Sequence, residues 1–229
     1  MAAALVAFIV TALAKPFAVF AASTNASDDE ICDPVADYAL GMEDYPRAIK
    51  LHQEVIQKHP ELALAYYHLG FAYGILGDHH REEADYRKAL ELGLSDWELF
   101  LNLGRLYLEN NHLDQSSNAF RLAALLAPSR PETHYNLGLV YERLGSLHKA
   151  EQEILLSLRL EPDQIDARNT LGIIYAEQRD FARAHAEWAE LKRSNPGYTP
   201  AVANLAILEQ AERQQSSGSP QRSGFAQAP

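Results

Sequence analysis

A period of 34 residues runs through most of the chain. The dipeptide Leu-Gly recurs at this interval, at Leu69-Gly70, Leu103-Gly104, Leu137-Gly138 and Leu171-Gly172. A tyrosine stands three positions after each of these glycines: Tyr73, Tyr107, Tyr141 and Tyr175. A proline closes most of the units at one phase: Pro60, Pro128, Pro162 and Pro196. Units of this length cannot bury a core alone, so the period predicts an array of stacked repeats that each contact their neighbours.

Each unit is predicted to hold two helices joined by a short turn. A glycine inside a helix costs roughly 1 kcal/mol relative to alanine, so glycines in register need a compensating reason. We expect that reason to be close approach of the second helix, where small residues face Gly104, Gly138 and Gly172: Ser116, Ala150 and Ala184. The second helix then presents a bulky residue one turn later: Tyr86, Phe120, Ile154 or Trp188. The closing proline stops this helix because it cannot continue the hydrogen-bond ladder.

Between residues 29 and 198 this pattern resembles the tetratricopeptide repeat family. The resemblance implies an all-α fold, a right-handed α-solenoid of helix–turn–helix repeats whose first helices line a concave face. Five repeats are expected, at 29–62, 63–96, 97–130, 131–164 and 165–198, followed by a capping helix at 199–213. We expect a bacterial, exported member of the family.

Two of the expected repeats depart from the pattern. In the first, Cys32, Val35 and Ala36 replace an aromatic residue, a leucine and the glycine, while Asp33-Pro34 is typical of a helix cap followed by a first-turn proline. A shortened helix is predicted there, as suits a terminal repeat. In the second repeat Glu82 occupies the small-residue position that faces Gly70, so local distortion is expected.

Residues 1–22 are predicted to be a signal peptide or a membrane anchor. The stretch 2–14 is apolar except for Thr11, and small residues before Ala22 offer a cleavage site. The anchor is the alternative because about 20 apolar residues can span a bilayer, although Lys15 at the centre disfavours it. Both place the body outside the cytoplasm, periplasmic or extracellular, or tethered to the membrane and facing outward. A cytoplasmic terminus is the third alternative.

The net charge, the cysteine content and the absence of catalytic motifs exclude several classes of function. A net charge of -11 repels phosphate backbones and disfavours nucleic acid as a partner. Cys32 is the single cysteine, which excludes an internal disulfide and a cluster of thiolate ligands, and no motif pairs it with a histidine. The chain has no phosphate-binding loop or nucleophile elbow, so we expect no enzyme activity, no cofactor and no metal site. Residues 214–229, rich in Gln, Ser, Gly and Pro, are predicted to be a disordered tail.

The resemblance implies a binding groove on the concave face. Its expected members come from the first helices of successive repeats: Tyr67, His68, Phe71, Leu101, Asn102, Arg105, Tyr135, Asn136, Leu139, Asn169, Ile173 and Asn204. Asn102, Asn136 and Asn204 share one phase, and an amide can donate to and accept from a peptide bond together. The alternative is that asparagine is simply common at this phase. The lysine clamp of related chaperone cofactors is absent, since its phases carry acids such as Asp33 and Asp37.

These observations predict a non-catalytic protein–protein interaction module or scaffold. It would bind an extended or amphipathic segment of a partner protein or peptide in the concave groove. The alternative is an envelope assembly factor, of the pilus or outer-membrane type, that acts through its outer face and ends.

Overall fold

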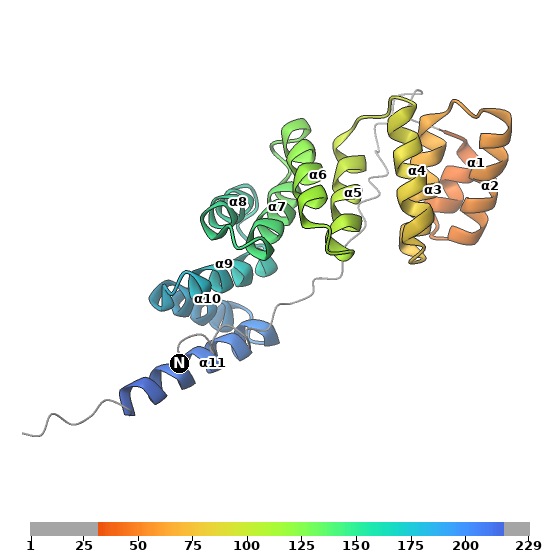
Figure 1. Cartoon of the computed structure of the whole chain (residues 1–229). Helices are drawn as coiled ribbons and strands as arrows, with labels where there is room; N and C mark the ends of the chain where they lie inside the picture. Colours follow the sequence, from red (N-terminus) through yellow and green to blue (C-terminus); the bar gives the residue numbers. More distant parts are fainter. Residues whose placement is uncertain (1–31, 218–229) are drawn as a thin grey trace, which may run out of the picture. The chain divides into compact units, whose positions relative to one another are not determined.

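The computed structural model describes residues 32–217, and every regular element in that range is an α-helix (Figure 1). The described residues fall into two compact units, 32–162 and 163–217. The predicted leader at 1–22 lies outside the described residues. None of the described helices combines the length and the apolar content that a bilayer crossing requires.

The unit formed by 32–162 contains eight helices, in which consecutive helices are joined by short turns and pack against each other as helix hairpins. They are α1 (Pro34–Gly41), α2 (Tyr45–Lys58), α3 (Ala63–Ile75), α4 (His79–Glu91), α5 (Trp97–Glu109), α6 (Leu113–Leu126), α7 (Pro131–Arg143) and α8 (Leu147–Leu160). Helices α3 to α8 each pack most extensively on their partner within the repeat, whereas α2 packs more extensively on α3 of the next repeat than on the short α1. Helices α3, α5 and α7 also contact one another in succession. This helix–turn–helix packing is that of an α-solenoid, which confirms the predicted fold class.

The helices follow the predicted frame closely. Ala63, Trp97 and Pro131 begin both the expected repeats and the helices α3, α5 and α7. The turn inside each pair contains one residue in the left-handed region, at the same phase each time: Glu43, Gly77, Asn111, Gly145 and Arg179. A left-handed residue is a common way to end a helix, so one turn geometry recurs through the array.

Close approach explains the helical glycines, as expected. Ser116 Oγ donates to the carbonyl oxygen of Gly104 at 2.7 Å. The atoms that would meet a Cβ first, however, belong to the bulky residue one turn later rather than to the small residue: a Cβ on Gly104 would lie 2.6 Å from the ring of Phe120. The aromatic or branched side chain therefore fills the space that the missing Cβ leaves.

The expected distortion around Glu82 is not found, and that prediction is wrong. Helices α3 and α4 are continuous, and Glu82 is buried with its carboxylate against Gly74. A Cβ on Gly74 would lie 2.6 Å from Glu82 Oε1. A second glycine, one turn after Gly70, therefore makes room for the larger side chain.

The first helix is short, as predicted. Asp33 Oδ1 accepts hydrogen bonds from the backbone N–H groups of Val35 and Ala36, both at 3.0 Å, and Pro34 follows the cap. The cap satisfies two of the donors that a helix N-terminus leaves without partners.

The unit formed by 163–217 contains α9 (Ile165–Glu177), α10 (Phe181–Ser194) and α11 (Thr199–Ser217). Trp188 of α10 is buried at the centre and donates from Nε1 to the carbonyl oxygen of Asn169 at 3.3 Å. Helix α11 continues to Ser217, four residues into the segment predicted as tail, which corrects that boundary. Gln214 and Gln215 have helix propensities close to that of alanine, which accounts for the extension.

Candidate functional site

A pocket of about 190 Å³ lies among α3, α4 and α5. Its apolar wall comes from Phe71, Tyr86 and Leu106. Its polar groups come from α4 and α5: Glu82, Asn102, Arg105 and Glu109. Successive helices of the array supply these side chains, so the pocket exists because neighbouring repeats stack.

The charges in the pocket are partly shielded from water. Burial raises the pKa of Glu82, and the hydrogen-bonded His79, 3.0 Å from Glu82 Oε2, counteracts part of that rise. Burial lowers the pKa of Arg105, while Glu109 beside it favours the charged guanidinium. An arginine stays protonated in proteins, so the pocket keeps one fixed cation between two carboxyl groups. Such partly desolvated groups interact more strongly than they would in bulk water.

The size of the pocket limits what it can hold. Sites for drug-sized ligands and cofactors occupy roughly 300–1,000 Å³, which exceeds the volume here. Water takes about 30 Å³ per molecule in the liquid, so the pocket matches a handful of waters or one amino-acid side chain. Its dimensions suit an anchor residue of a bound chain.

Three of the residues predicted for the groove meet at this pocket: Phe71, Asn102 and Arg105. Tyr67 adjoins them, because Asn102 Nδ2 donates to its hydroxyl at 3.2 Å. Leu101 packs instead in a core cluster with Leu137. Tyr135, Asn136 and Leu139 are half-buried on α7, outside the pocket lining, and Asn169, Ile173 and Asn204 are buried in the unit 163–217.

The asparagines at the shared phase are engaged inside the protein. Asn136 Nδ2 donates to the carbonyl oxygen of Glu132 at 2.7 Å, one turn earlier in the same helix. Asn204 Nδ2 donates to Asn169 Oδ1 at 3.2 Å, and both residues are 1% exposed. The amide of Asn204 thus satisfies a buried polar group, and that of half-buried Asn136 bonds within its own helix, which is the arrangement that the structural interpretation expects.

The periodic pattern missed Glu82 and Tyr86 as pocket residues, because it assigned the groove to first helices by phase and both residues lie on the second helix α4. One signal was present: Glu82 is an acid at a position where the other repeats carry a small residue. An ionisable residue at a packing position is a better indicator of a pocket than of distortion.

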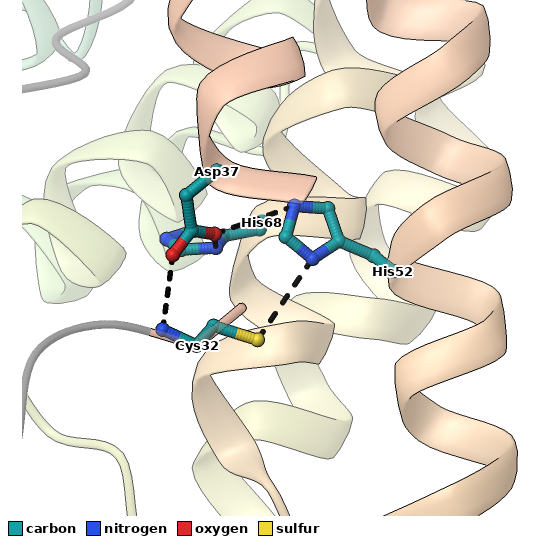
Figure 2. A group of neighbouring side chains, drawn as sticks. All are labelled: Cys32, Asp37, His52 and His68. Atoms are coloured by element: carbon teal, nitrogen blue, oxygen red, sulfur yellow. Dashed lines mark hydrogen bonds and ion pairs between the residues drawn. The ribbon is translucent and has the colours of Figure 1, made fainter. Parts of the chain in front are cut away.

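His68 lies away from the pocket, in a polar cluster with Cys32, Asp37 and His52 (Figure 2). Cys32 Sγ is 3.8 Å from His52 Nδ1, so the fold brings this cysteine to a histidine with which no sequence motif pairs it. Burial, together with the charges of Asp37 and Asp33, raises the pKa of the thiol to about 12. The thiol is therefore protonated at neutral pH and is a poor nucleophile as it stands.

Family models described as tetratricopeptide repeat match residues 63–92 and 101–165. Over these two ranges the chain matches tetratricopeptide repeats. Arrays of such repeats form extended surfaces that bind other proteins. No curated protein sequence matches the chain.

Solved structures share the repeat fold at low sequence identity. YrrB, described as a TPR protein with an unusual peptide-binding site, has a TM-score of 0.70 and 19% identity, and the match covers 81% of this chain and 94% of YrrB. MamA from Desulfovibrio magneticus RS-1 has a TM-score of 0.67 and 21% identity, covering 74% and 98% of the two chains. A repeat protein from Parabacteroides merdae has a TM-score of 0.69 and 19% identity, covering 80% and 73%. These likenesses concern the fold of the repeats.

Proposed function

We propose that the chain is a non-catalytic interaction module that binds an extended or amphipathic segment of a partner protein, with one side chain of that segment in the pocket. The observation that carries the proposal is the pocket among α3, α4 and α5. It combines an apolar wall with Glu82, Asn102, Arg105 and Glu109, and its volume suits a single side chain.

The charges indicate the kind of anchor. Glu82 and Glu109 flank one cation, Arg105, and the whole chain carries a net charge of -11. An anchor whose polar end both accepts and donates hydrogen bonds would pair with the Arg105 guanidinium and with a carboxylate of the pocket, and its apolar stem would pack on Phe71 and Tyr86. The peptide-binding site described for YrrB offers a precedent for peptide recognition on this fold.

The test selects peptide ligands for the full chain from a displayed random library and measures their dissociation constants. Arg105→Met removes the half-buried cation and keeps an unbranched side chain, while Glu109→Gln removes an acceptor charge. Arg121→Met, at an exposed position of α6, is the matched control. We expect at least about tenfold weaker binding for the pocket variants, equivalent to about 1.4 kcal/mol, and no change for the control. Equal losses in all variants, or none in any, would remove the pocket from the proposal.

An outer-face assembly role is the second candidate, and exposed leucines of α6 favour it. Leu122, Leu125 and Leu126 are 43%, 76% and 49% exposed, which places an apolar surface on one helix. Leu125→Ser leaves the pocket unchanged. Loss of a native assembly in Leu125→Ser, with intact assembly in Arg105→Met, would favour this second role over the first.

We further propose that the module acts outside the cytoplasm, periplasmic, extracellular or tethered to a membrane through residues 1–22. The apolar stretch 2–14 and the small residues before Ala22 support it. Fractionation of cells that express the full chain, with the N-terminal residue of the mature protein determined, tests the location. A cytoplasmic chain that begins at Met1 would contradict it.

A further inference from the structure

Four side chains with metal-binding atoms converge at the N-terminal end of the array (Figure 2). Cys32 precedes α1, Asp37 lies on α1, His52 on α2 and His68 on α3. One ligand atom from each residue can be chosen so that all lie within 4.8 Å of one another. Three successive helices and the chain before them therefore meet at one polar point.

His52 is a polar residue at a position where the other repeats carry a hydrophobic one. Its phase holds a bulky hydrophobic side chain in the other four repeats: Tyr86, Phe120, Ile154 and Trp188. The side chain of His52 is 0% exposed, and its Nε2 has no hydrogen-bond partner among the described residues. A buried polar atom without a partner costs about 1–3 kcal/mol, so a histidine here calls for a ligand.

The backbone aims the carboxylate of Asp37 at the histidines. The N–H groups of Cys32 and Asp33 donate to Oδ2 at 3.0 and 3.3 Å. Oδ1 consequently faces the imidazoles, 2.9 Å from His68 Nδ1 and 3.7 Å from His52 Nε2. Hydrogen bonds of this kind hold the ligands of metal sites in position.

We propose that Cys32, Asp37, His52 and His68 bind one divalent cation of the zinc type. A thiolate, a carboxylate and two imidazoles form a mixed set of the sulfur, oxygen and nitrogen donors that tetrahedral zinc accepts. Neighbouring ligands of such an ion lie about 3.3–3.7 Å apart, because its bonds are about 2.0–2.3 Å long. With His52 Nε2 as its ligand atom, Asp37 Oδ1 lies 2.9 Å from His68 Nδ1 and 3.7 Å from His52 Nε2, close to this range. One ligand atom from each of the four residues lies within 4.8 Å of the others, so side-chain rotations would close the remaining separations.

The charges and the position of the site fit a structural cation. On binding, the thiol of Cys32 loses its proton to water, and the thiolate and the carboxylate together neutralise the two positive charges of the ion. The ion would join the chain before α1 to α2 and α3, and so fasten the end of the array where α1 is only eight residues long. A metal bound by the folded state alone stabilises that state.

Cobalt(II) is the probe, because its spectrum reports both geometry and sulfur ligation. The full chain is stripped with a chelator and titrated with Co²⁺, and Zn²⁺ is then added in competition. We expect one Co²⁺ per chain, with the thiolate-to-cobalt charge-transfer band and the intense visible bands of a tetrahedral site. A spectrum of octahedral type without the charge-transfer band would overturn the proposal, because it would place the metal on exposed histidines.

Three variants assign the ligands. Cys32→Ser makes the smallest change, His52→Phe restores the residue type found at Phe120, and His68→Asn restores that of Asn102, so these changes respect the repeat pattern. We expect each to weaken Zn²⁺ binding by more than about 100-fold, the upper range for losing an outer partner alone. His148→Gln, at an exposed position in the first turn of α8, is the control. Unchanged affinity in Cys32→Ser and His52→Phe would refute the site.

A stability readout separates this site from nonspecific binding. Zn²⁺ is expected to raise the thermal unfolding midpoint of the native chain and of His148→Gln. His52→Phe is expected to show no such rise while its far-ultraviolet circular dichroism remains native. A rise of equal size in His52→Phe would overturn the assignment.

Discussion

The change in the free energy of unfolding caused by an alanine at each helical glycine should depend on which atoms the new Cβ contacts. In Gly104→Ala the Cβ would lie 2.6 Å from the ring of Phe120, which is fully buried and cannot turn away freely. Overpacking of this kind costs about 1–3 kcal/mol, and alanine recovers about 1 kcal/mol of helix propensity. With a rigid ring the upper part of that range applies, so we expect a net loss of about 1–2 kcal/mol.

The same substitution has a smaller expected cost where the neighbour can move. In Gly138→Ala the nearest atom is Cδ1 of Ile154, the end of a flexible side chain, also at 2.6 Å. Ile154 is also fully buried and its Cγ1 would lie at 2.7 Å, so rotation of Cδ1 relieves only part of the clash and we expect a net loss smaller than that of Gly104→Ala. Gly41→Ala is the control, since nothing lies within 4 Å of its Cβ, and it should stabilise α1 by about 0.5–1 kcal/mol.

Urea unfolding followed by circular dichroism measures the three variants, with the slopes compared so that a changed unfolded state is recognised. The double variant Gly104→Ala/Phe120→Leu isolates the clash, because a smaller side chain frees the space. A coupling energy of about 1 kcal/mol or more in favour of the pair is expected. If Gly104→Ala is as stable as Gly41→Ala, close packing is not the reason for the glycines.

Two further substitutions test the charges and the buried hydrogen bonds. Burial raises the pKa of Asp85 from 3.8 to about 6, so the folded state favours the protonated carboxyl and loses stability as pH rises from about 4 to 6. Asp85→Asn should therefore stabilise the protein by about 1–2 kcal/mol above pH 6 and leave its stability unchanged below pH 3.8. Urea titrations at the two pH extremes measure the difference. Tyr67→Phe removes the hydroxyl to which Asn102 donates at 3.2 Å, and the buried amide left behind should lower the free energy of unfolding by about 1–3 kcal/mol. An unchanged value in urea unfolding would show that the Asn102 amide does not depend on Tyr67.

The repeat period was enough to predict where four of the first helices begin. Ala63, Trp97, Pro131 and Ile165 begin helices where the frame expected them, because each element satisfies the same packing requirement one repeat further on. The repeat period could not predict which side chains remain exposed to solvent once the helices stack. Asn102 and Asn204 share a phase with a peptide-binding role in related arrays, yet here both amides bond to buried partners. Whether an asparagine amide is hydrogen-bonded inside the protein depends on the contacts between repeats, and the position within the repeat does not specify those contacts.

Glu82 and His52 show that the informative positions of a periodic chain are those that break its period. Both stand at phases where the other repeats pack small or bulky apolar residues, and both are buried. Burying an ionisable side chain costs free energy unless a partner compensates, so each substitution needs a local reason. Around Glu82 that reason is a pocket made possible by Gly74, and around His52 it is a cluster that also contains Cys32, Asp37 and His68. A repeat array repeats the same packing position several times, and an ionisable residue at such a position indicates a polar site rather than apolar packing.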